Sequence, residues 1–99
     1  MNMQAMLKQA QQMQKQMMAE QEKISNMDFT GENGLVKVTM KGSKRIEKVE
    51  IQKEDDFGKD DLEMLEDMIM VAFNDASKKV DEDKEKKLGK YGKGLSGLM

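Results

Sequence analysis

The chain has 99 residues, a formal net charge of −2, and neither cysteine nor histidine. These absences exclude disulfides, thiolate chemistry, the usual zinc sites and the commonest acid–base catalyst of enzymes. A chain of this length forms one small domain in which burial of apolar surface only just exceeds the entropic cost of folding, so association into a dimer would stabilise it.

No stretch of the sequence is typical of a membrane segment. The longest apolar run, Met68 to Phe73, is far too short to span a bilayer, and the N-terminal segment lacks the uninterrupted apolar core of a signal peptide. We therefore expect a cytoplasmic protein that has no membrane partner.

The first predicted element is a helix over residues 3–24. Its apolar residues recur at spacings of three, four and seven, which places them on one side of a helix. They are Met3, Met6, Ala10, Met13, Met17 and Ile24. This methionine seam predicts packing against a second helix, within the core or across a dimer, and the alternative is a methionine-rich surface that binds other proteins.

Three antiparallel strands are predicted in the middle of the chain, because short runs alternate apolar and polar residues between turn signals. The runs are residues 27–31, 35–40 and 45–51, and the turn signals lie at residues 32–34 and 41–44. Val36, Val38 and Met40 share one face, and Asn33-Gly34 is a typical hairpin turn. Since three short strands are unstable alone, their apolar face needs cover from helices or another subunit, and any open edge must be paired or protected.

A second helix is predicted to begin at Asp60, which forms a capping-box signature with Glu63. Its apolar stripe consists of Leu62, Leu65, Ile69, Ala72, Ala76 and Val80. Further apolar residues widen the stripe in the middle, so we expect the helix to be enclosed there on more than one side. Glycines recur from Gly89 onwards, which predicts a single domain over residues 1–88 and a flexible Gly/Lys tail over residues 89–99.

The predicted order defines an α+β fold, α-β-β-β-α, in which two long helices flank a three-stranded antiparallel meander. Charge is uneven along the second helix: residues 59–77 hold one lysine and six acidic residues, whereas residues 78–93 hold seven lysines and four acidic residues. If the two helices pack antiparallel, the basic end of the second lies beside the start of the first. A dimer joined through its sheets would then carry two basic projections.

Eight lysines near this basic end are the candidate functional residues. They are Lys8, Lys15, Lys78, Lys79, Lys84, Lys86, Lys87 and Lys90. From the residues alone, a solvated helix surface is the simpler interpretation of these lysines, and contact with phosphates is the functional one.

No catalytic, metal or cofactor site is predicted. The acidic segment 54–61 does not fit a calcium loop, because Phe57 and Met64 would occupy positions where that loop requires ligands. The serines and the tyrosine have no histidine base, and glycine-rich nucleotide-binding motifs are absent. We therefore expect neither an enzyme nor a protein with a cofactor, a metal ion or a small-molecule substrate.

Four segments carry a family resemblance: QAQQMQ at residues 9–14, GLVKVT at 34–39, EMLED at 63–67 and AFNDA at 72–76. In this order they resemble the YbaB/EbfC family of bacterial nucleoid-associated proteins, over about residues 3–88. The resemblance implies a homodimer of α-β-β-β-α subunits that binds double-stranded DNA at the nucleoid and catalyses nothing.

With this resemblance, the eight lysines become the predicted contacts to DNA. Lysine binds phosphate as a point charge, so binding should be weakly sequence-specific and should weaken steeply with salt. Arg45 is the sole candidate for bidentate reading of a base. The alternative function is a methionine-rich helical interaction module, adaptor or chaperone-like, whose contact with DNA is incidental.

Overall fold

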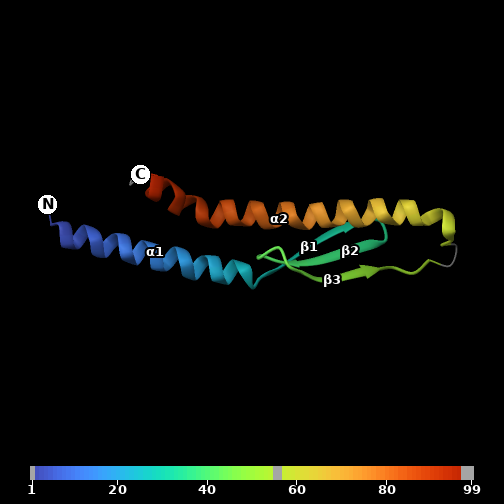
Figure 1. Ribbon diagram of the computed structural model, residues 1–99, viewed down its shortest axis with the longest axis horizontal. Coiled ribbons are helices and arrows are strands. Elements are labelled where there is room, and N and C mark those ends of the chain that lie inside the picture. The colour runs from blue at the N-terminus through green and yellow to red at the C-terminus, as the bar shows by residue number, and fades with distance from the viewer. Residues whose placement is uncertain (1, 55–56, 97–99) are drawn as a thin grey trace.

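A computed structural model of the chain describes residues 2–54 and 57–96, with side chains up to Tyr91. Its elements are α1 (Met3–Ser25), β1 (Asp28–Asn33), β2 (Val36–Lys41), β3 (Ile46–Ile51), the 3₁₀ turn η1 (Lys59–Asp61) and α2 (Leu62–Ser96). The molecule is elongated, with extents of 72 × 20 × 14 Å, and both helices run along its long axis (Figure 1). The predicted α+β class and the α-β-β-β-α order are confirmed.

Helix α1 has the predicted bounds to within one residue and is capped at both ends. The Asn2 side-chain oxygen accepts hydrogen bonds from the N–H groups of Gln4 (3.1 Å) and Ala5 (3.4 Å), which satisfies two donors that the first turn leaves unpaired. At the other end, the Asn26 side-chain amide donates to the Glu22 carbonyl oxygen (3.0 Å). These local contacts set where the helix begins and ends.

The methionine seam of α1 is covered only near the sheet. Ile24 is buried and Met13 and Met17 are partly covered, but every residue from 3 to 12 is exposed, including Met3 at 81%. The first half of the seam therefore projects without a packing partner in the described part of the chain.

The strands form the predicted antiparallel meander, in the order β1-β2-β3. The first turn lies one residue later than predicted: β1 continues to Asn33, which pairs with Val36, so Gly34 and Leu35 form the tip. Gly34 has φ = 55°, a left-handed conformation that glycine adopts without the steric cost of a Cβ. The position of this turn sets the register and hence which face of β2 is buried.

The core lies between β2 and α2. Val36, Val38 and Met40 project from one face of β2, as predicted, and each is at most 1% exposed. The opposing stripe of α2 consists of Ala72, Ala76 and Val80, all fully buried. Because two of these three are alanines, the helix axis can approach the sheet closely.

Helix α2 covers only part of the sheet. It packs on β1 and β2, whereas all six residues of β3 are exposed. Among the described residues of the single chain, nothing encloses the middle of the helix as predicted: Met70 is 56%, Val71 46% and Phe73 36% exposed.

The helix begins differently from its prediction. The N-cap position falls on Gly58, ahead of η1, instead of on Asp60, and the Asp61 side chain at the third position of this turn accepts a hydrogen bond from the Gly58 N–H (2.9 Å). The acidic first turn still lies at the positive end of the helix dipole.

The helix also ends later than predicted. It continues through Gly89 to Ser96, into the segment expected to be a flexible tail. A glycine weakens a helix by about 1 kcal/mol but keeps its backbone hydrogen bond, so Gly89 does not end it. The flexibility of residues 89–99 stays a prediction, and residues 97–99 lie outside the described residues.

Gly31 sets how closely β1 approaches α2. A Cβ at this position would overlap the carbonyl oxygen of Ala72 and would lie 2.5 Å from the backbone nitrogen of Ala76. Both neighbours belong to the helix backbone and cannot move aside as a flexible side chain would.

Replacing Gly31 with alanine is expected to lower the free energy of unfolding by about 2 kcal/mol, because the added methyl group forces β1 away from α2. Gly58→Ala is the matched control, since no heavy atom of the described residues lies within 4 Å of the Cβ added there. Urea unfolding of the two variants measures the difference. Equal stability of both would show that β1 and α2 are not closely packed.

Candidate nucleic-acid interface

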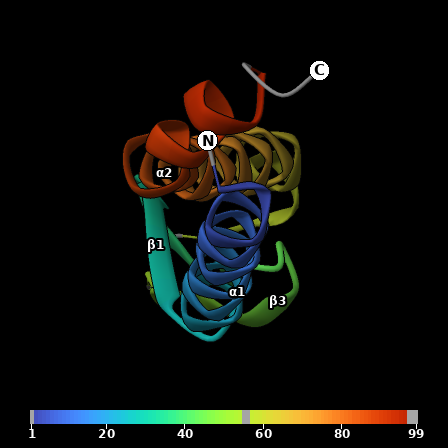
Figure 2. The same cartoon turned by 90° about the vertical axis from the view of Figure 1, so that its left-hand side faces the viewer.

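Two helical arms extend from one end of the sheet. The arms are α1 and residues 84–96 of α2, and the start of α1 lies at the same end of the molecule as the end of α2 (Figure 1). Seen end-on, α1 and α2 lie one above the other, with β1 and β3 on opposite sides (Figure 2). The start of α1 and the basic part of α2 therefore lie at the same end of the molecule, as expected if the two helices are antiparallel.

Lys8 and Lys15 project from the outer side of α1. The packed side of this helix is marked by Met13, Met17 and Ile24, and the two lysines, spaced two turns apart, lie about half a turn around the helix from it. Both are exposed. They therefore share an end of the molecule with the lysines of α2 but face away from that helix.

Three of the candidate lysines are held by carboxylates one helical turn away. The pairs are Lys78–Glu82 (3.9 Å), Lys79–Asp75 (3.3 Å) and Lys87–Asp83 (3.1 Å). The exposed pairs of Lys78 and Lys79 each stabilise a helix by only about 0.3–0.5 kcal/mol, whereas the pair of Lys87 with Asp83 is half-buried. All three pairs nevertheless offset the positive charge that an approaching phosphate would meet.

Lys79 and Asp75 also close the free edge of β1. The Lys79 ammonium donates a hydrogen bond to the Thr30 carbonyl oxygen (2.8 Å), and the Asp75 carboxylate accepts one from the Glu32 N–H (3.3 Å). Backbone groups that stay unpaired on an open edge would otherwise form hydrogen bonds with a strand of another chain. Lys79, predicted as a DNA contact, thus has a structural role that the sequence pattern does not reveal.

The other five candidates form no ion pair among the described residues. They are Lys8, Lys15, Lys84, Lys86 and Lys90. Lys84 is half-buried beside Ile24 and Leu88 in a depression of about 220 Å³ between the arms. The Lys90 ammonium lies 5.0 Å from the ring centre of Tyr91, a contact that leaves its charge intact. These five are the cations that the arms present to an anionic partner.

A second basic group, which was not among the candidates, lies where β2 meets the following loop. Lys41 pairs with its cross-strand partner Asp28 (2.7 Å) and approaches Glu47 (4.0 Å). The hydrogen bond with Asp28 raises the pKa of Lys41 above its ordinary value despite partial desolvation, and the charges of both carboxylates act in the same direction. Only the strand register, unknown from the sequence, brings these groups together.

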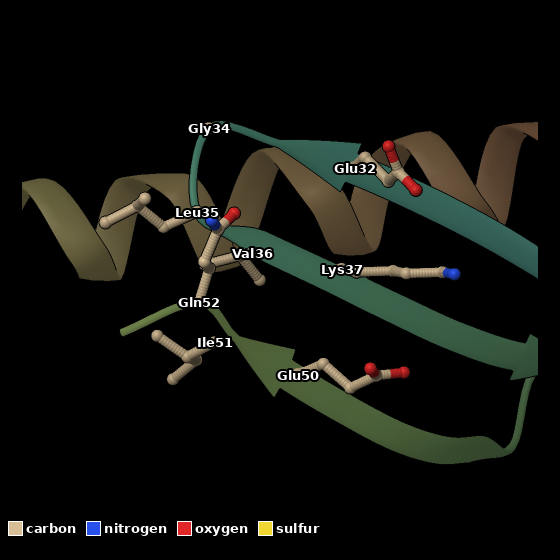
Figure 3. Close-up of a pocket in the computed structure, with 8 residues that line it drawn as sticks. All are labelled: Glu32, Gly34, Leu35, Val36, Lys37, Glu50, Ile51 and Gln52. Atoms are coloured by element: carbon tan, nitrogen blue, oxygen red, sulfur yellow. The ribbon is translucent and has the colours of Figure 1, made fainter. Parts of the chain in front are cut away.

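An open depression of about 390 Å³ lies at the tip of the first hairpin (Figure 3). Lys37 extends between Glu32 and Glu50 on the side of the sheet away from α2. One cation between two carboxylates does not favour a phosphate.

Within residues 2–54 and 57–96, no three His, Cys, Asp or Glu side chains are grouped so as to hold a metal ion. None of the helices described there combines the length and apolarity that a bilayer crossing requires.

The fold and the surface define an α-β-β-β-α protein whose helical arms carry exposed lysines. The chain belongs to the YbaB/EbfC DNA-binding family, whose model matches residues 1–95. It is therefore a member of a family of non-catalytic DNA-binding proteins, as the sequence predicts.

Individual relatives agree with this assignment. The chain is 43% identical over 99 residues to a nucleoid-associated protein of Enterococcus faecalis, with 98% of this chain and 94% of the relative covered. It is 44% identical over 97 residues to a nucleoid-associated protein of Lactococcus lactis, with 96% and 97% covered. Its fold is similar to the crystal structure of an uncharacterized protein from Helicobacter pylori, with a TM-score of 0.75, 22% identity, and 92% of this chain and 97% of that chain covered.

Replacing Lys79 with alanine is expected to lower the free energy of unfolding by about 1 kcal/mol, because one hydrogen bond and one ion pair are lost. Lys78→Ala removes only the exposed pair with Glu82 and should cost no more than about 0.5 kcal/mol. Chemical unfolding followed by circular dichroism compares the two variants. If both lost the same stability, Lys79 would have no special role at the β1 edge.

Proposed function

We propose that this protein is a cytoplasmic, nucleoid-associated protein that binds double-stranded DNA through contacts between lysine side chains and phosphates. One observation carries the proposal: five lysines on the arms are free of ion pairs in the described part of the chain. Family membership and the names of the relatives support DNA as the partner.

The arm of α2 differs in charge from η1 and the first turns of the same helix. Residues 84–93 include five lysines and one acidic residue, whereas residues 59–77 include one lysine and six acidic residues. A duplex would therefore be attracted to the arms and repelled by η1 and the first turns of α2, although the whole chain has a net charge of −2. Each lysine that neutralises a phosphate releases counterions without reading a base, so affinity should depend strongly on salt and weakly on sequence.

A triple variant, Lys15→Ala with Lys86→Ala and Lys90→Ala, tests the arms. It should bind a short duplex at least about 10-fold more weakly at low salt. The slope of log affinity against log salt should fall by about 2 to 3, because each phosphate contact contributes about 0.9. Fluorescence anisotropy titrations at several salt concentrations measure both quantities.

The matched control removes the same charge outside the arms, at Lys37, Lys53 and Lys59, and should keep the salt slope of the wild type. Wild-type protein that does not bind at low salt, or binds without salt dependence, would refute the proposed lysine–phosphate contacts.

A second copy of the chain is the proposed protein partner, and β3 offers it an apolar face. Val38 lies opposite Val49, and Val36 opposite Ile51. Since cross-strand partners share a face, Val49 and Ile51 lie on the α2 side of the sheet, yet they are 43% and 49% exposed. Exposed apolar residues beside a packed core are typical of a surface that another subunit covers.

The flank of α2 above β3 extends this apolar surface. Asp75 reaches β1, so residues on the opposite flank of the helix lie on the β3 side. Leu62 and Phe73 lie there and are 53% and 36% exposed. A subunit that packs on β3 would also contact this flank.

The two edges of the sheet differ in a way that supports pairing through β3. Side chains of α2 bond the backbone of β1, whereas no side chain in the described residues bonds the backbone of β3. An open apolar edge pairs readily with another strand, and an identical strand is self-complementary about a two-fold axis. Two copies joined in this way would carry two pairs of arms, and simultaneous contact by both would raise affinity.

Val49→Lys is expected to convert the dimer into monomers, because it places a charge in the interface. Val71→Lys is the matched control: Val71 is 46% exposed, against 43% for Val49, but lies one turn before Asp75 on the β1 flank of α2. Sedimentation at several concentrations measures both. A wild-type protein that sediments as a monomer would contradict the dimer, and dissociation by Val71→Lys alone would move the interface to the β1 side.

The exposed apolar end of α1 favours a second candidate function. Met3, Met6 and Leu7 are 81%, 51% and 61% exposed, and methionine adapts to varied apolar partners. An adaptor or chaperone-like interaction module would use this surface, with incidental contact to DNA. Salt-sensitive binding that requires the arm lysines supports the first function, and its absence supports the second.

A further inference from the structure

The loop between β2 and β3 lies at the end of the sheet from which the arms extend (Figure 1). Two backbone hydrogen bonds of 2.8 Å close it, from the Lys41 N–H to the Arg45 carbonyl and from the Lys44 N–H to the Lys41 carbonyl. A third, from the Gly42 N–H to the Met27 carbonyl (3.0 Å), ties it to the segment that joins α1 to β1. The loop is therefore fixed at the base of α1.

Contacts with both helices hold this loop in an unusual conformation. Lys44 has φ = 70°, in the left-handed region that side chains disfavour. Its ammonium pairs with Asp81 on α2 (2.9 Å), and Gly42 lies so close to the Ile24 carbonyl oxygen of α1 that a Cβ would overlap it. The residue that follows this anchored segment is Arg45.

Arg45 is the cation of this loop region that has no ion pair in the described part of the chain. The neighbouring lysines are paired as follows: Lys41 with Asp28 and Glu47, Lys44 with Asp81, and Lys48 with Glu50. The nearby carboxylates are thus already engaged, and the side chain of Arg45 is exposed. It is also the only arginine in the sequence.

We propose that Arg45 makes a bidentate contact with duplex DNA at the base of the arms. This inference rests on the DNA-binding function proposed above. A guanidinium presents two parallel N–H donors, which match the paired oxygens of a phosphate or the O6 and N7 atoms of guanine, whereas a lysine ammonium acts as a point charge. Because the loop backbone is already fixed, binding of the guanidinium has to order only the Arg45 side chain.

Arg45→Lys removes the two parallel N–H donors of the guanidinium but keeps its positive charge. It should weaken duplex binding about 10-fold with an unchanged salt slope, because the charge remains and the paired donors are lost. Arg45→Ala should weaken binding at least as much and lower the salt slope by about 1. Lys37→Ala, which removes one exposed cation at the far end of the sheet, is the control and should bind like the wild type.

Two duplexes of equal length, one of A·T pairs only and one that contains G·C pairs, distinguish the acceptor. If Arg45→Lys loses the same affinity for both duplexes, the acceptor is a phosphate. If it loses more affinity for the duplex that contains G·C pairs, the acceptor is a guanine edge. Sedimentation and thermal unfolding of each variant exclude a folding defect. Wild-type affinity of Arg45→Lys on both duplexes overturns this inference alone, whereas a wild-type protein that binds neither duplex at low salt overturns the proposed function.

Discussion

The close contact of α2 with β1 and β2 is possible because small residues line it. Gly31 lies against the helix backbone at Ala72 and Ala76, and this proximity lets Val36 and Val38 become fully buried. Each buried side chain of this kind contributes about 1.5–3 kcal/mol, so a core with few such residues leaves a narrow margin of stability. The position of α2 on the sheet determines which of its charged residues contact the strands. It also determines where the arm of α2 extends beyond the sheet.

The same helix uses lysine in two ways, and the difference follows from what lies beside each lysine. Over the sheet, Lys79 meets a strand edge and bonds a backbone carbonyl. Beyond the sheet, Lys86 and Lys90 meet no carboxylate in the described part of the chain, so their charge is available to an anionic partner. Residues 59–77 hold six acidic residues and one lysine, whereas the arm over residues 84–93 holds five lysines and one acidic residue. A protein with a slightly negative total charge can therefore still attract phosphates at one end.

Helix α2 covers β1 and β2 but leaves β3 exposed. The exposed strand is the surface through which we propose that two copies of the chain associate. One helix is too narrow to cover three strands, and α2 protects the β1 edge with Asp75 and Lys79. The apolar residues of β3 and the adjacent flank of α2 remain exposed as a consequence. The proposed dimer would bury this surface and leave the arms accessible.

The sequence by itself determined the element order, the helical seam of α1 and the buried face of β2, because these depend on the local periods of helix and strand. It placed the first turn one residue early, since Asn33 and Gly34 both tolerate a left-handed conformation and only strand pairing selects between their positions. The sequence identified eight candidate lysines but did not reveal which of them form ion pairs with carboxylates. Lys79 bonds Thr30, and Lys44 pairs with Asp81; in each case the partners lie far apart in the chain, and only the packing of α2 on the sheet brings them within bonding distance.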